Sequence, residues 1–250
     1  MTAIPQSRNR RAALVSAMCA LLVTGTALTG CGEEDPNEGT NGVGRLPADK
    51  IQAKTRKVAE AAEAVRLHGT VVTSGRTYKL DMRLKSDGGT GSVTAKGMTF
   101  QLMRTGEELF LKADAGFWSH ADGEGDNGDA AAAEKLSGKY VKVPQGDPSY
   151  KKFSGFTDKD LLLEGLLTLH GKLATDGHHE QAGVRTIRIT GDKGAGGTLD
   201  VSLEGTPYPL RLVRAGSAGT LSFSDWGQDF ALKEPAQDEI LDYGRQLPSS

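Results

Sequence analysis

One segment, Thr77–Lys85, alternates apolar and polar residues, and this alternation constrains the fold more than any other feature of the sequence. A period of two places the two kinds of side chain on opposite faces of a β-strand, so that one face is buried and the other meets water. Similar short segments, separated by glycine turns such as Asp87-Gly88-Gly89, recur in residues 67–111 and 184–224. The sequence therefore predicts two blocks of antiparallel strands.

Two other segments have the period of an amphipathic helix. After Pro47, the inward-facing positions recur at spacings of four and three up to Val65. Thr157–Asp160 resembles a capping box and precedes a leucine-rich run at residues 161–167. We interpret the leucine-rich run as a core helix, with a lid or a membrane-touching helix as the alternative. Because an apolar sheet face has to be covered, we expect an α+β domain with one large curved antiparallel sheet under helices.

The N-terminus has the three regions of a secretory signal peptide. Three arginines within residues 8–11 precede a mostly apolar run, which closes on Leu28-Thr29-Gly30-Cys31. This tetrapeptide resembles the lipobox of bacterial lipoproteins, which implies cleavage after residue 30 and acyl groups, such as palmitate, on Cys31. An ordinary secreted protein and a membrane anchor with an incidental cysteine are the alternatives. The run is short for a spanning helix and contains four polar or glycine positions, which disfavours the anchor.

Composition limits what the mature chain can bind. Loss of the three arginines lowers the count of Lys and Arg from 30 to 27 against 32 Asp and Glu, which gives a formal charge of −5. A chain with this negative charge is not held on an anionic membrane by a basic patch. The same charge predicts no nucleic-acid partner. Attachment must then come from hydrocarbon on Cys31. The other cysteine, Cys19, leaves with the signal peptide, so no disulfide is available.

The predicted domain order follows from these segments. Residues 1–30 form the lipoprotein signal peptide, and residues 31–46, which are rich in Gly, Asn and acidic side chains, form a flexible tether after the lipidated Cys31. Residues 47–250 are long enough for one well-packed domain.

Several short motifs occur in an order that resembles the actinobacterial lipoproteins of the LppX/LprG group, whose fold is similar to that of the LolA and LolB carriers. The motifs are the lipobox, the first helix, the strand meander, and the segments Leu109–Lys112, Phe117-Trp118, Gly138–Val143 and Leu221–Gly227. The resemblance implies an unclosed half-barrel with helices over its concave face and an apolar cavity between them. It also implies a lipid-anchored protein on the extracytoplasmic face of the cell membrane. The acidic stretch Asp122–Asp129 departs from the group's pattern.

Inward-facing apolar side chains of the two strand blocks are the candidate lining of such a cavity. They are Leu80, Met82, Leu84, Phe100, Leu102, Ile187, Ile189, Val201 and Leu203. On residue types alone, such a face is more often a plain core than a ligand site. The resemblance adds the expectation that a lipid or lipoglycan acyl chain binds there, since apolar cavities suit acyl chains, and that the protein carries it across the envelope. The alternative is a non-catalytic sensor or protein-interaction lipoprotein with a solidly packed core, which meets an envelope partner through a surface such as the acidic stretch.

Catalytic and metal-binding patterns are weak. The loop beginning at Asp122 has alternating oxygens, but Asn127 and Ala133 occupy positions where a calcium loop needs Gly and Glu. His170, His178, His179 and Glu180 lack the spacing of a zinc motif, and Ser149–Lys152 lacks the partner motifs of a penicillin-binding site. We therefore expect neither an enzyme nor a cofactor.

Overall fold

The structure is a computed structural model, and it describes residues 35–120 and 127–242. The chain divides into two compact units, Met1–Glu34 and Asp35–Ser250. The predicted signal peptide, Cys31 and most of the acidic stretch lie outside the described residues. Everything below concerns the second unit.

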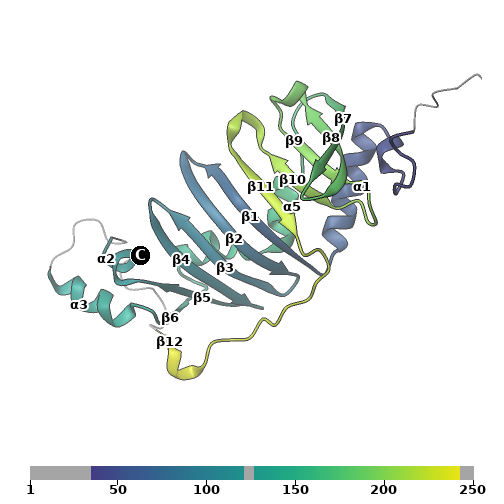
Figure 1. The fold of residues 1–250 in the computed structure, drawn as a ribbon. Coiled ribbons are helices and arrows are strands. Elements are labelled where there is room, and N and C mark those ends of the chain that lie inside the picture. Colours follow the sequence, from purple (N-terminus) through teal and green to yellow (C-terminus); the bar gives the residue numbers. More distant parts are fainter. Residues whose placement is uncertain (1–34, 121–126, 243–250) are drawn as a thin grey trace, which may run out of the picture. The chain divides into compact units, whose positions relative to one another are not determined.

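The first strand block is a meander of antiparallel strands, in which two helices precede the last strand (Figure 1). Its turns suit the strands: Ser74 and Gly75, between the first two strands, have φ of 49° and 70°, the left-handed geometry that tight hairpins require. The strands are β1 (Ala64–Thr73), β2 (Arg76–Lys85), β3 (Gly88–Ala95), β4 (Met98–Thr105), β5 (Glu108–Ala113) and β6 (Tyr140–Val143).

The second block joins the first through its last strand. β11 pairs with β1 over the register Arg66↔Ser224 to Val71↔Gly219, so a single twelve-stranded sheet forms, with β7 and β12 at its two edges. The short β12 runs parallel to β6, and the other pairs are antiparallel. The expected large antiparallel sheet, unclosed and covered by helices, is therefore confirmed. The remaining strands are β7 (Leu173–Gln181), β8 (Val184–Gly191), β9 (Thr198–Ser202), β10 (Pro209–Val213), β11 (Gly219–Ser224) and β12 (Ile240–Leu241).

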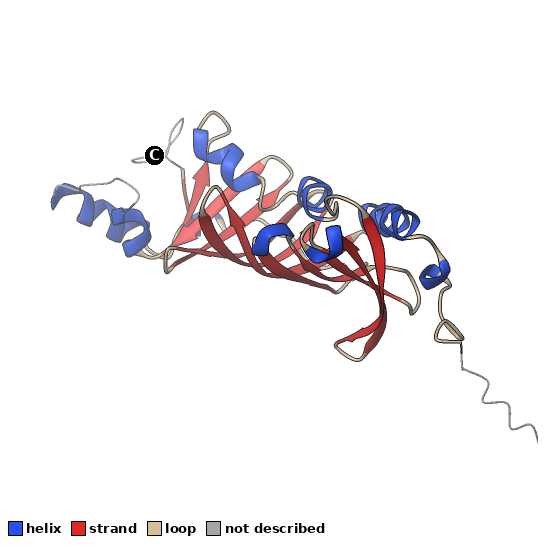
Figure 2. Cartoon of the chain, turned by 90° about the horizontal axis from the view of Figure 1, so that it is seen from above, coloured by secondary structure: helices blue, strands red, loops and turns tan. Residues whose placement is uncertain are grey.

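Most of the helices gather on one side of the curved sheet (Figure 2). They are α1 (Ala48–Ala61), α2 (Ala115–His120), α3 (Asn127–Leu136), α4 (Pro148–Ser154) and α5 (Lys159–Leu166). None of the helices among the described residues combines the length and the apolar character needed to cross a membrane.

Two predicted helix boundaries are wrong. The first helix was expected to extend to Val65, but α1 ends at Ala61 because Ala62 is already extended, and Val65 pairs with Leu84 in the sheet. At α5, the N-cap is Asp158 rather than Thr157. The Asp158 carboxylate accepts a hydrogen bond from the Leu161 N–H at 2.9 Å, which satisfies a helix-end donor.

The predicted tether is also wrong where it includes residues 35–46, because this segment packs on the domain. The backbone N–H of Asn41 donates to the carbonyl of Leu203 at 2.8 Å, and its side-chain amide donates to the carbonyl of Ser202 at 3.0 Å. Val43 is fully buried in the core. Val43 and Leu46 stand in a polar, glycine-rich stretch without helical or strand periodicity, so no local pattern predicts that this segment packs at the end of β9.

Candidate functional site

The nine candidate lining residues all lie in one continuous core, on the face of the sheet that meets the helices. Cross-strand pairing places them there, since directly opposed residues share a face: Leu80 aligns with Val93 and then Phe100, and Ile187 aligns with Val201. None of the nine exposes more than 5% of its surface. We call this the concave face. That it lines a ligand cavity stays a prediction.

Two glycines shape the middle of the concave face. Gly89 aligns with Leu84, and Gly91 aligns with Met82. A Cβ at Gly89 would lie 2.6 Å from a methyl of Leu84, and one at Gly91 would lie 2.7 Å from the Met82 sulfur. The missing side chains therefore provide the space that Leu84 and Met82 occupy. The predicted turn at Asp87-Gly88-Gly89 is wrong for its two glycines, which belong to β3, where glycine inside a strand marks such a close approach.

The concave face of β2 and β4 is covered by α4, α5 and the linker between them, residues 148–167, which we call the cover. The Phe153 ring of α4 contacts the Phe100 ring edge-on at 5.5 Å between centroids. In the linker, Phe156 contacts Tyr78 at 5.5 Å. Leu163, Leu166 and Leu167 are buried, whereas Leu161 is 59% exposed, so the leucine-rich helix is principally a core helix.

Polar contacts attach the cover to the sheet and to α1. The Arg104 guanidinium, on β4, donates to the hydroxyl and to the carbonyl oxygen of Thr157 at 3.1 and 3.0 Å. The Lys159 ammonium donates to the carbonyl of Glu60, near the C-terminal end of α1, at 2.7 Å. Lys159 is 3% exposed and also pairs with Asp160 at 2.8 Å. These contacts satisfy groups that covering the core removes from water.

Tyr150 makes a further attachment, between α4 and the turn before β5. Its hydroxyl donates to the carbonyl of Glu107 at 2.7 Å. Burial raises the pKa of this phenol, because the charged form loses hydration.

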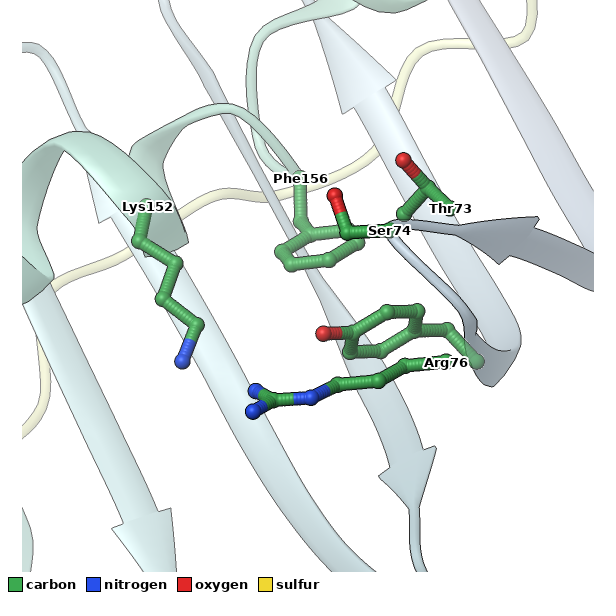
Figure 3. Close-up of a pocket in the computed structure, with 6 residues that line it drawn as sticks. Thr73, Ser74, Arg76, Lys152 and Phe156 are labelled. Atoms are coloured by element: carbon green, nitrogen blue, oxygen red, sulfur yellow. The ribbon is translucent and has the colours of Figure 1, made fainter.

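A pocket of about 480 Å³ lies where the cover meets the tip of the β1–β2 hairpin (Figure 3). Sequence reasoning did not identify this site, because its residues come from segments about 80 positions apart. It is lined by Thr73, Ser74, Arg76, Tyr78, Lys152 and Phe156.

Metal-binding side chains do not cluster in the described part of the chain: no group of three or more His, Cys, Asp or Glu could hold an ion there. Of the candidates considered above, His178 contacts the Asn37 side-chain oxygen at 3.2 Å and His179 contacts the Asp176 carbonyl at 2.9 Å. The His178 ring thus contacts the N-terminal segment of the domain, and the His179 ring contacts its own strand, β7.

No protein-family model matches this sequence, and no curated protein matches it. Solved structures do resemble it. LprF from Mycobacterium bovis superimposes with a TM-score of 0.52 at 15% identity, over 76% of this chain and 97% of that one. Lipoprotein LppX from Mycobacterium tuberculosis gives a TM-score of 0.43 at 16% identity, over 74% and 99%. At this level of identity the likeness to LprF shows a shared fold, which is the fold that the sequence resemblance implied.

Proposed function

We propose that this chain is a lipid-anchored protein of the cell envelope whose half-barrel binds the acyl part of a lipid or lipoglycan between the concave face and the cover. The observation that carries the proposal is the continuous apolar face, which is curved, spans both strand blocks and is closed over β2 and β4 by the short helices of the cover. A compact core does not require a sheet of this extent, whereas a long apolar chain fits such a face.

The cover has the properties of a part that can be displaced. α4 has 7 residues and α5 has 8, and helices shorter than about 12 residues are marginal without tertiary packing. Their order therefore depends on the aromatic contacts of Phe153 and Phe156 and on the Arg104 and Lys159 hydrogen bonds. Because the lining side chains of β2 and β4, such as Leu80 and Phe100, are buried beneath the cover, an acyl chain gains access when the cover moves away from these strands.

The anchor is proposed from the sequence alone. Cys31 would carry the acyl groups, and two acyl chains suffice for durable attachment at about 0.8 kcal/mol per buried methylene. Only residues 31–34 then separate the lipid from the packed domain, because the chain is part of the domain from Asp35 onward. Such a short connection holds the half-barrel close to the bilayer, from which a lipid could be taken.

Uptake of a fluorescent fatty acid by residues 35–250, which form one compact unit, tests the acyl site. Leu80→Trp and Val201→Trp fill the concave face from the two strand blocks, and we expect each to reduce uptake per folded molecule. Ser92→Trp is the matched control, because Ser92 aligns with Asp81 and Gln101 on the outer face. Native mass spectrometry of the wild type should also show co-purifying lipid. Absence of both bound lipid and probe uptake in the wild type would refute the proposal.

A second candidate function is a sensor or interaction module with a filled core. The observation that favours it is the complete burial of Met82, Leu84 and Val201 by the surrounding side chains. In that case the tryptophan variants lose about 1–3 kcal/mol of stability through overpacking, and the wild type neither takes up the fatty acid nor carries lipid after purification.

A further inference from the structure

The pocket beside the cover combines an aromatic floor with two cations. Tyr78 and Phe156 supply the aromatic surface, and Arg76 and Lys152 lie at its rim. In Figure 3 the guanidinium of Arg76 and the ammonium of Lys152 extend toward the same space below Phe156. One cation comes from β2 and the other from α4, so the folded arrangement, rather than local sequence, brings them together.

In the part of the chain that the structure describes, neither cation forms an ion pair with an acidic side chain. None of the six lining residues is acidic. The ammonium of Lys152 lies 5.5 Å from the centre of the Phe153 ring. A contact with a ring face leaves the N–H donors of an ammonium able to bind an anion. Two like charges around one pocket repel each other, and a bound anion relieves this repulsion.

Thr73 and Ser74 also line the pocket, from the hairpin tip. In the view of Figure 3 their hydroxyls lie on the opposite side of Phe156 from the two cations, so the groups that face a common space are the Arg76 guanidinium and the Lys152 ammonium. A guanidinium fork and an ammonium are groups that bind phosphate oxygens in proteins. The volume of about 480 Å³ falls within the range of roughly 300–1,000 Å³ that is usual for small-molecule sites.

The position of the pocket decides what kind of anion suits it. Tyr78 begins the inward-facing row of β2 that continues through Leu80, Met82 and Leu84. The anion site therefore lies at one end of the apolar face, beside the linker of the cover. We propose that Arg76 and Lys152 bind the phosphate or a similar anionic headgroup of an amphiphile whose acyl chain lies along the concave face. This inference rests on the proposed acyl function and specifies the ligand class: an anionic lipid rather than a neutral one.

Two ligands that share one acyl chain and differ in their headgroup test this inference. They are monopalmitoylglycerol and its phosphate ester, titrated as monomers at low salt against residues 35–250 in competition with a fluorescent fatty acid. Inorganic phosphate is titrated in parallel. We expect the wild type to bind the ester about tenfold more tightly than the neutral lipid, since charge-assisted hydrogen bonds contribute at this level. We expect inorganic phosphate alone to displace no probe.

The decisive variant is Arg76→Gln combined with Lys152→Gln. Both side chains are exposed, so the fold should be retained. The preference for the ester should disappear while the affinity for monopalmitoylglycerol stays unchanged. Lys79→Gln combined with Lys151→Gln removes the same charge from exposed positions outside the pocket and should keep the preference.

The other outcomes separate the two proposals. Equal affinity of the wild type for both lipids would overturn the headgroup site and leave the acyl proposal in place. A preference for the phosphate ester that survives in the Arg76 and Lys152 double variant would do the same. If neither lipid binds, the acyl proposal fails and the inference falls with it. Direct binding of inorganic phosphate by calorimetry, lost in the double variant without any lipid binding, would identify a site for a free anion instead.

Discussion

Arg104 donates to both the hydroxyl and the carbonyl oxygen of Thr157, and so joins β4 to the linker of the cover. Thr157 is fully buried, and its hydroxyl in turn donates to the carbonyl of Ser154 at the end of α4. The Arg104 side chain is 13% exposed. Sheet, linker and helix thus share one hydrogen-bond network that is largely shielded from water, where such bonds are hardest to replace.

Arg104→Met should loosen the cover. The substitution leaves the buried carbonyl of Thr157 without its donor, which costs about 1–3 kcal/mol of the free energy of unfolding. Urea denaturation of residues 35–250 measures this loss. If the acyl proposal is right, the rate of fatty-acid uptake should rise at the same time, because displacing the cover becomes easier.

Arg66→Met is the matched control for that experiment. Arg66 forms a bidentate pair with Asp81, but about half of each side chain is exposed on the outer face, with exposed fractions of 44% and 46%. Exposed pairs contribute about 0–1 kcal/mol. Equal losses of stability in the two arginine variants, with equal uptake rates, would show that the Arg104 contact has no special role in holding the cover.

Tyr150 should make the domain sensitive to alkaline pH. Because burial raises the pKa of this phenol, the folded state keeps the proton at a pH where the unfolded chain, with an ordinary pKa of about 10, loses it. The stability that Tyr150 contributes is therefore fully present below the unfolded-state pKa of about 10, and it is lost as the pH rises through the higher pKa of the folded state. Tyr150→Phe should cost about 1 kcal/mol at neutral pH through the lost hydrogen bond to Glu107. It should also flatten the fall in stability above pH 10. A fall of unchanged steepness in this variant would assign the alkaline sensitivity to other groups.

Cys31→Ser should release the protein from the membrane fraction or leave its precursor uncleaved. The reason is that the sulfur of Cys31 is the only thiol that remains after cleavage at residue 30. Fractionation with mass spectrometry of the N-terminal peptide provides the measurement, and Ser16→Ala, within the apolar run, is the control. A wild-type peptide without acyl mass on Cys31 would contradict the anchor.

Thermal stability should not depend on redox conditions. Residues 35–250 contain no cysteine, so no disulfide can contribute to their stability. The melting temperature of this unit should be the same with and without dithiothreitol. A drop of several degrees in the reductant would mean that another reducible group supports the fold.

The inward-facing side chains of β2 could be predicted because alternation is a local property of the sequence. β7 could not, since Leu173–Gln181 is mostly exposed and has no apolar alternation. It is a strand because β8 offers it an edge to pair with. In the same way, Val65 continues the helical spacing of apolar residues in the sequence, but in the structure it pairs with Leu84 in the sheet. Tertiary pairing outweighs such weak local preferences.

By itself, the sequence determined the class of the fold, the identity of the buried face and the candidate anchor at Cys31, because periodicity and short motifs reside in neighbouring residues. Only the tertiary structure decided which distant segments meet. The pairing of β1 with β11, the Arg104–Thr157 contact and the placement of Lys152 opposite Arg76 each join segments more than 50 residues apart. The physical reason is that such contacts form where packing of the apolar face brings distant segments of backbone together. A pattern within neighbouring residues does not specify which distant segment it will contact.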